Sequence, residues 1–296
     1  MAHVALKAHE PNVIPTPCSV VYNDGSYTLS TRSTVGTECE ELKPLVDYAS
    51  QEFGIGKARN KANISIFIDE ILSFEEYRLN VTEEGISIYG GDYGGAFNGV
   101  VTLMQLMPAE VYEKGITSSF TIPCCEIVDR PRFEHRGFML DVCRTWMDKE
   151  AVMEFIDLLA YHKINSLRLH LTDDEAWRIE IKSHPELAEV GGYRGGDSPI
   201  WPRYGKWNER WGGYYTQVEM SEIIDYASVR NIEVIPEIDL PGHSLCMATM
   251  HPEILCNYTP RTSASFGYDT RSAHLPYCSE QANRSTESII ICIPVT

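Results

Sequence analysis

The chain has 296 residues, of which 43% are hydrophobic and 10% aromatic, so it carries enough apolar material for one large or two ordinary folded domains and is not a disordered chain. Its formal net charge of -17 argues against nucleic acid and against an anionic membrane as partners, because like charges repel over a screening length of roughly 8 Å at physiological salt. A neutral substrate fits this charge better.

The cysteines and the N-terminus bear on the compartment. Nine cysteines form no Cys-x-x-Cys pair, and an odd number cannot pair completely within the chain, so we expect mostly free thiols, with a Cys246–Cys256 bond as the alternative. Residues 1–10 lack the apolar core of a signal peptide, and no apolar run approaches the roughly 20 residues that span a bilayer. We therefore expect a soluble chain without an export signal, whose localisation stays undefined.

The first part of the chain predicts a small α+β domain over residues 1–129. Apolar residues at helical spacing predict two helices, and alternating apolar residues predict three strands, the last two joined as a hairpin. The helices are expected at Glu38–Phe53 and Gly95–Met107, and the strands at Ala62–Asp69, Tyr77–Val81 and Ile86–Tyr89. No cluster of titratable residues stands out here, so no catalytic role is expected of this domain.

The segment Pro123–Arg132 breaks the periodicity with two prolines, and we place the domain boundary there. The second domain, residues 130–296, alternates strands with helices, which is typical of a parallel α/β barrel. Strands are expected at Phe138–Val142, Leu167–Leu171 and Ile232–Ile238, and helices at Asp148–Ile164, His184–Val190 and from the capping box Thr216–Glu219 to Val229.

Polar residues follow two of these strands directly. The strand ending at Leu171 runs into Asp173, Asp174 and Glu175, and the strand ending at Ile238 runs into Asp239 and then His243. Because the carboxyl ends of parallel barrel strands open onto one mouth, these titratable groups are expected to share a pocket there.

Four separate motifs give the chain a specific resemblance. They are His135–Arg144, His170–Asp174 with Trp177–Ile181, Gly213–Gln217, and Pro236–Ser244. In this order and spacing they resemble the family-20 glycoside hydrolases, the β-N-acetylhexosaminidases. The first half also looks like the accessory domain of that family, with Ile14–Pro17 near its start and Gly94–Gly99 opening a helix. The resemblance runs from about Pro11 to Cys256 and fades after about Asp269.

The resemblance implies a fold and a reaction. The fold is an α+β accessory domain followed by the first part of a TIM (β/α)8 barrel, here apparently truncated. The reaction is removal of terminal N-acetylglucosamine or N-acetylgalactosamine by a substrate-assisted retaining mechanism, without metal or cofactor. In the family an adjacent Asp-Glu pair, in a Gly-Gly-Asp-Glu type motif after the fourth strand, orients the acetamido group and protonates the leaving oxygen. This chain contains no such motif, so it is expected to be inactive alone.

The resemblance also assigns roles to four residues. Arg144 matches the arginine that binds substrate hydroxyls, whereas a structural ion pair with Asp141 is the simpler alternative. Asp173, Asp239 and His243 match a polar shell around the acid Glu, in which a carboxylate fixes the tautomer of an imidazole. The alternative for Asp239 and His243 is that they stabilise their own turn by hydrogen bonds to the backbone.

Other polar and aromatic candidates have simpler explanations. His170 is expected to be a satisfied histidine of the barrel interior. Trp201, Trp207 and Trp211 are expected to pack within their loop, because the family tryptophans that wall the acetamido pocket come later in the barrel.

Two readings from other classes stay open. One is a sugar-binding remnant without catalysis. The other is a barrel metallohydrolase with His170, Asp173, Asp239 and His243 as ligands, although the first strand lacks the His-x-His pair that such a site favours.

The tail departs from the pattern from about residue 270. Residues 279–287 carry no apolar stripe, and residues 289–295 form an apolar end without periodicity. We expect a frameshift or premature stop between about Asp269 and Cys278.

Overall fold

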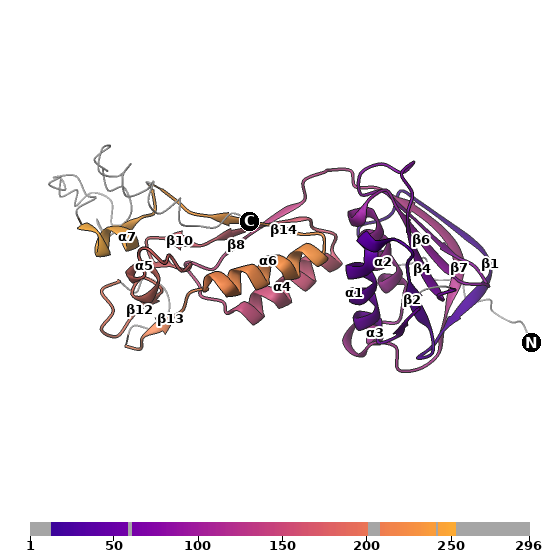
Figure 1. Ribbon diagram of the computed structural model, residues 1–296, viewed down its shortest axis with the longest axis horizontal. Helices are drawn as coiled ribbons and strands as arrows, with labels where there is room; N and C mark the ends of the chain where they lie inside the picture. The colour runs from indigo at the N-terminus through magenta and orange to yellow at the C-terminus, as the bar shows by residue number, and fades with distance from the viewer. Residues whose placement is uncertain (1–12, 59–60, 201–207, 241, 253–296) are drawn as a thin grey trace, which may run out of the picture. The chain divides into compact units, whose positions relative to one another are not determined.

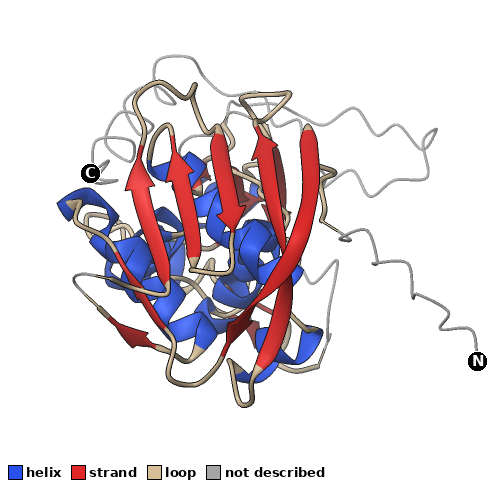
Figure 2. Cartoon of the chain, turned by 90° about the vertical axis from the view of Figure 1, so that its right-hand side faces the viewer, coloured by secondary structure: helices blue, strands red, loops and turns tan. Residues whose placement is uncertain are grey.

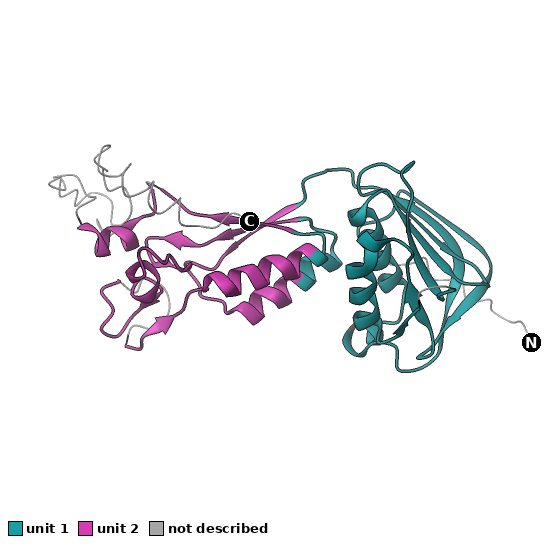
Figure 3. Ribbon diagram, in the orientation of Figure 1, with its two compact units in different colours: residues 1–136, 157–165, 229–232 teal, residues 137–156, 166–228, 233–296 magenta. Residues whose placement is uncertain are grey.

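A computed structural model describes residues 13–58, 61–200, 208–240 and 242–252, and the chain divides into two compact units (Figures 1 and 3). The first unit contains residues 1–136 with 157–165 and 229–232, and the second contains 137–156, 166–228 and 233–296. The expectations for Trp201, Trp207, Cys256 and the tail lie outside the described residues. The six described cysteines are free thiols, and no described helix has the length and apolar character needed to cross a membrane.

A seven-stranded mixed sheet forms the first unit, and the helices of this unit lie on one of its faces (Figures 1 and 2). Its strand order is β1-β7-β5-β6-β4-β2-β3. The strands are β1 (Ser19–Leu29), β2 (Thr34–Gly36), β3 (Gly56–Lys57), β4 (Ile64–Ile68), β5 (Tyr77–Val81), β6 (Ile86–Gly90) and β7 (Phe120–Asp129), and the helices are α1 (Lys43–Phe53), α2 (Tyr93–Leu106) and α3 (Ala109–Lys114). The predicted hairpin is confirmed, since β5 and β6 pair antiparallel.

Glycine at position 99 helps helix α2 to lie close to the sheet. Asp92 caps the helix by accepting a hydrogen bond from the Gly95 N–H at 2.7 Å. A Cβ at Gly99 would lie only 2.5 Å from the Ile88 side chain, so only glycine allows this approach. The helix buries an apolar face against β5 and β6, which gives this unit its core.

Three sequence expectations for the first unit were wrong or incomplete. Helix α1 begins at Lys43, not Glu38, because Pro44 favours the first helical turn, and only a short 3-10 turn precedes it. The proline-containing segment that was taken as a break lies largely in β7. Pro123 is tolerated because β5 pairs only with residues 125–129 of that strand, and because β1 has an irregular register there. Strand β1 itself was missed.

Two buried polar side chains complete the first unit. Glu75, only 2% exposed, accepts hydrogen bonds from Asn165 at 3.2 Å and Asn231 at 2.7 Å and pairs with Arg136. Lys163 donates to Thr102 at 2.8 Å, and burial lowers its pKa to about 8 although Asp129 opposes this shift. Residues distant in sequence are thus held together by charge inside this unit.

The second unit is built on three parallel strands in the order β14-β9-β8. They are β8 (Gly137–Asp141), β9 (Ser166–His170) and β14 (Glu233–Glu237), alternating with α4 (Lys149–Tyr161) and α6 (Gln217–Val229) as predicted. Smaller elements are β10 (Thr172–Asp173), β11 (Ala176–Trp177), α5 (Glu186–Glu189), β12 (Tyr193–Arg194), β13 (Trp211–Gly212) and α7 (Leu245–Met250).

The predicted helix caps are confirmed. Asp148 accepts a hydrogen bond from the Ala151 N–H at 2.9 Å at the start of α4. Thr216 and Glu219 form the reciprocal capping box of α6, at 2.8 Å from the Thr216 N–H and 3.1 Å from the Glu219 N–H. These caps fix the residue at which each helix begins.

We expect the 296-residue chain, made alone, to self-associate. Among the described strands, β8 and β14 each have β9 as their only neighbour, and Phe138 and Ile235 on them are 46% and 38% exposed. Light scattering coupled to gel filtration should detect oligomers, and a Phe138→Lys/Ile235→Lys variant should reduce them. A monodisperse monomer of the parent chain at tens of micromolar would contradict this expectation.

Candidate active site

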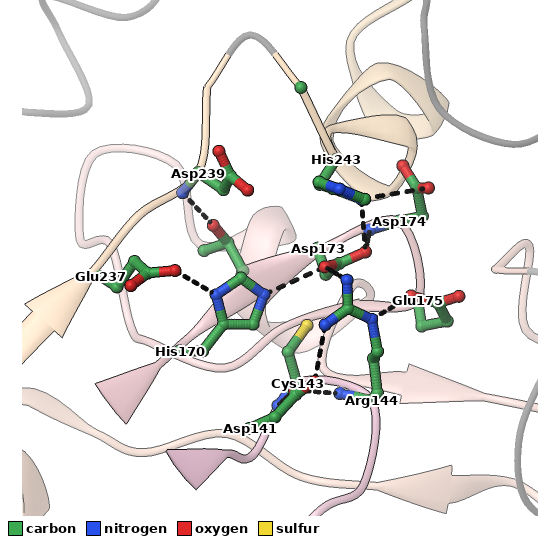
Figure 4. A network of polar contacts seen from close by, with 12 residues as sticks. Asp141, Cys143, Arg144, His170, Asp173, Asp174, Glu175, Glu237, Asp239 and His243 are labelled. Carbon is green, nitrogen blue, oxygen red and sulfur yellow. Dashed lines mark hydrogen bonds and ion pairs between the residues drawn. The ribbon is translucent and has the colours of Figure 1, made fainter. Parts of the chain in front are cut away.

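The carboxyl ends of the three parallel strands lie side by side in the second unit. Asp141, His170 and Glu237 occupy the same level, because His170 pairs in register with Asp141 on one side and Glu237 on the other. The residues that follow each strand gather around them (Figure 4). The mouth predicted from the sequence is therefore lined by titratable side chains.

Arg144 is held by carboxylates on two sides. Its guanidinium lies 2.6 Å from Asp141 and also pairs with Asp173, while Glu175 lies 3.8 Å away. Burial would lower its pKa, but the hydrogen bond to Asp141 and the neighbouring carboxylates outweigh this effect and raise it. The side chain remains 34% exposed, so this cation is fixed in position and still open to a ligand.

Asp173 joins the arginine to two histidines. It is 2% exposed, lies 3.0 Å from Nε2 of His170 and 3.3 Å from Nδ1 of His243, and accepts the Asp174 N–H at 2.6 Å. Burial alone would raise its pKa, but the hydrogen bonds from His170 and from the backbone, with the charge of Arg144, keep it below its ordinary value. Asp173 is therefore a buried anion.

His170 lies between two carboxylates. Its Nδ1 is 2.7 Å from Glu237 and its Nε2 is 3.0 Å from Asp173. The hydrogen bond to Asp173 raises its pKa in spite of burial. Both ring nitrogens are occupied by carboxylates, which leaves neither available to a metal ion. His170 is thus buried and fully hydrogen-bonded, as the sequence analysis preferred.

The raised pKa of His170 gives the second unit a pH-dependent stability. The folded state binds this proton more tightly, so the stabilisation is complete below the ordinary value of 6.5 and is lost as the pH rises through the folded pKa. All five tryptophans belong to this unit, so their fluorescence reports on it. Urea midpoints should fall between about pH 6 and pH 9. His170→Gln should flatten this slope, and an equally steep slope in the variant would contradict the assignment.

The structure brings together most, but not all, of the predicted shell. His243, at a φ of 50° in its turn, is 44% exposed and lies 3.7 Å from Asp174 as well as near Asp173. Asp239 donates its N–H to Thr172 Oγ1 at 2.9 Å, but its carboxylate makes no hydrogen bond to Asp173 or His243 in Figure 4. Asp239 therefore flanks this group and is not a member of its hydrogen-bond network.

Of two further acidic residues of the site, Glu175 was expected at the mouth, whereas Glu237 was not anticipated. Glu237 reaches His170, and Glu175, 2% exposed, lies beside Arg144. Register alone would have revealed Glu237, because it lies opposite His170 on the neighbouring strand. Trp211, the described member of the three loop tryptophans, lies under Arg194 at 4.5 Å and Arg178 at 5.9 Å, in agreement with a packing role.

The positive charge of Arg144 argues against the alternative that this site binds a metal ion. Asp173, Asp174 and His243 bring ligand atoms within 4.8 Å of one another, a spacing at which a metal ion could be held. However, Asp173 is already paired with the guanidinium of Arg144, and both ring nitrogens of His170 face carboxylates. The donor set therefore favours a site that recognises polar, uncharged groups through Arg144 over one built for a metal.

Comparison with known proteins gives two family matches. Residues 133–291 match the glycosyl hydrolase family 20 catalytic domain, and residues 10–130 match domain 2 of that family. A beta-hexosaminidase of Porphyromonas gingivalis is 39% identical over 259 residues, 83% of this chain and 32% of the relative. One from Vibrio furnissii is 34% identical over 255 residues, 82% of this chain and 40% of the relative.

Solved structures agree with these matches. The exo beta-N-acetylglucosaminidase of Vibrio harveyi in complex with N-acetylglucosamine superposes with a TM-score of 0.84 at 31% identity, over 94% of this chain and 44% of that one. The Streptomyces plicatus N-acetyl-beta-hexosaminidase gives 0.80 at 30% identity, over 95% and 56%. The chain thus spans 32% to 40% of the length of the two curated relatives named above.

Proposed function

Because the chain belongs to glycosyl hydrolase family 20, we propose that it forms the substrate-hydroxyl-binding part of a β-N-acetylhexosaminidase site. The reaction is hydrolysis of terminal, non-reducing N-acetyl-D-hexosamine from β-N-acetylhexosaminides, glycans and chitooligosaccharides included. Its mechanism is substrate-assisted, with the sugar acetamido oxygen as the nucleophile and retention of configuration.

The observation that carries this proposal is the partly exposed Arg144 fixed between Asp141 and Asp173 at the strand ends. A planar guanidinium has five donors, so two carboxylates can hold it while other N–H groups face the mouth. Neighbouring hydroxyls of a sugar ring present acceptors at a matching spacing. Arg144 would orient the non-reducing end, and orientation of a bound substrate is a large contribution to catalysis.

Asp173 and His243 have the second role in the proposal. Nδ1 of His243 lies 3.3 Å from Asp173, so the other ring nitrogen is directed away from this carboxylate. That nitrogen can hydrogen-bond the general acid Glu of the site and tune its pKa. Asp239 lies on the same loop as His243, and its backbone hydrogen bond to Thr172 would stabilise that loop.

The 296-residue chain itself is expected to be inactive. It has no Gly-Asp-Glu sequence to supply the acid and the acetamido-orienting carboxylate, and general acid catalysis alone contributes about 10²–10⁴-fold. Purified from a host without hexosaminidase, it should not release 4-nitrophenol from 4-nitrophenyl N-acetyl-β-glucosaminide above background. Turnover that disappears in Asp173→Ala would show that this chain has catalytic groups of its own and that the assignment is wrong.

The proposal is tested by completing the barrel. In what we call the joined protein, residues 1–252 of this chain are followed by the part of the Porphyromonas gingivalis relative that comes after the residue aligned with Pro252. We expect the joined protein to hydrolyse 4-nitrophenyl N-acetyl-β-glucosaminide. A folded, monodisperse joined protein that binds N-acetylglucosamine without turnover would favour the sugar-binding remnant instead.

A further inference from the structure

A second group of metal-ligand side chains lies in the second unit, apart from the strand ends. Glu186, the first residue of α5, has its Oε1 2.9 Å from Nε2 of His251 and 3.4 Å from Nδ1 of His184. The three candidate ligand atoms all lie within 4.8 Å of one another. None of these residues takes part in the site around Arg144.

We propose that His184, Glu186 and His251 form a binding site for a divalent transition metal of the zinc class. Two imidazole nitrogens and one carboxylate are a ligand set that zinc and its neighbours favour, whereas calcium and magnesium require oxygen ligands. Metal–ligand bonds of about 2.0–2.2 Å in a tetrahedral site separate the ligand atoms by roughly 3.3 Å. The Glu186 carboxylate is already near this spacing from both histidine nitrogens, at 2.9 and 3.4 Å.

The geometry of the two rings suits a shared metal. Their centroids are 5.5 Å apart and their planes are nearly perpendicular, at 88°, so both can turn a nitrogen toward one point without clashing. The three side chains are 22–39% exposed, so a metal can enter and a water molecule can occupy a fourth position.

The backbone around the site is fixed before any metal arrives. The His184 N–H donates to Ile181 O at 3.0 Å, and the His251 N–H donates to Met247 O at 2.9 Å. Gly191, just after α5, is packed so tightly that a Cβ there would lie 2.8 Å from Cys246 Sγ on α7. The ligands therefore come from two segments already in contact, which lowers the cost of ordering them.

A metal at this site would stabilise the position of the segment that contains His243 and α7. Helix α7 begins directly after that turn, and the Leu245 N–H donates to Asp174 at 3.1 Å. A metal bound by His251 at the end of α7 and by Glu186 on α5 links both ends of this segment to the body of the unit. The metal is thus structural and does not take part in sugar hydrolysis.

The test uses the untagged, chelator-treated 296-residue chain titrated with Co²⁺, whose visible absorption reports coordination by imidazole. We expect about one equivalent to bind and Zn²⁺, but not Ca²⁺ or Mg²⁺, to displace it. Glu186→Gln and His251→Gln should each weaken binding at least tenfold, whereas His135→Gln, at an exposed histidine of the first unit, should not change it. Zn²⁺ should also raise the melting temperature read from tryptophan fluorescence in the parent chain and not in His251→Gln.

Three results would overturn the proposal. The first is a parent chain that binds no Co²⁺ at micromolar concentrations. The second is Glu186→Gln and His251→Gln variants that bind as tightly as the parent. The third is binding that survives in both but is lost in His243→Gln, which would place the metal at Asp173, Asp174 and His243.

Discussion

Arg144→Lys in the joined protein is expected to lower kcat/KM for 4-nitrophenyl N-acetyl-β-glucosaminide by roughly 10- to 100-fold, because a charge-assisted hydrogen bond contributes about 1.5–3 kcal/mol. Lysine keeps the charge but has no planar fork, so it cannot reproduce the fixed geometry in which the guanidinium contacts Asp141 and Asp173 and still faces a sugar hydroxyl. The measurement is steady-state kinetics on variants whose circular dichroism matches the parent.

The matched control for this change is Arg78→Lys. Arg78 forms a 3.9 Å ion pair with Glu126 on the surface of the first unit, where such pairs contribute little. Its kcat/KM should equal that of the parent. If both lysine variants keep the parent value, Arg144 is a structural residue paired with Asp141, which was the simpler alternative from the sequence.

Glu75→Gln is expected to destabilise the first unit by about 3 kcal/mol, the range found when a buried ion pair loses one partner. Glu75 is 2% exposed and receives Arg136, Asn165 and Asn231. The neutral amide of glutamine removes the anion that pairs with Arg136. It also places an NH₂ donor against the NH₂ donors of Asn165 or Asn231.

Hydrogen exchange of peptides from β5 and β6, followed by mass spectrometry, measures this loss directly. The first unit contains no tryptophan, so the tryptophan fluorescence midpoint should stay unchanged and serves as an internal reference. Glu70→Gln, at an exposed position, is the control and should exchange like the parent. Equal protection in Glu75→Gln and Glu70→Gln would mean that the buried charges contribute nothing to stability.

Local pattern was sufficient for most of the fold. Period-two runs such as Ile64–Ile68 and helical stripes such as that of α4 reflect burial on one face, so they are visible without the structure. The caps at Asp148 and Thr216 involve residues three positions apart and are equally local. The family resemblance, confirmed by both domain matches, rests on motifs that lie at the strand ends.

Features that depend on long-range contacts were not predictable. Strand β1 is mostly exposed and contains Asn23, Asp24 and Gly25, so it has no apolar alternation and exists because β7 pairs with it at the sheet edge. The partnership of Glu237 with His170 depends on strand register, which composition does not reveal.

Side-chain direction was also beyond the sequence. Asp173 and Asp239 both follow a strand at the mouth, and the sequence treats them alike. In the structure the Asp173 carboxylate lies beside Arg144 and two histidines. Asp239 instead donates its backbone N–H to Thr172. Only the path of each loop after its strand decides which carboxylate enters the network.

The central claim is that Arg144 binds substrate while Asp173 and His243 position the general acid. Its most direct test is the kinetic profile of the joined protein with His243→Gln. The account predicts a lower kcat, a KM close to that of the parent, and a shift of the pH–rate limb that reports the acid. A folded variant with the kcat and pH profile of the parent would contradict it.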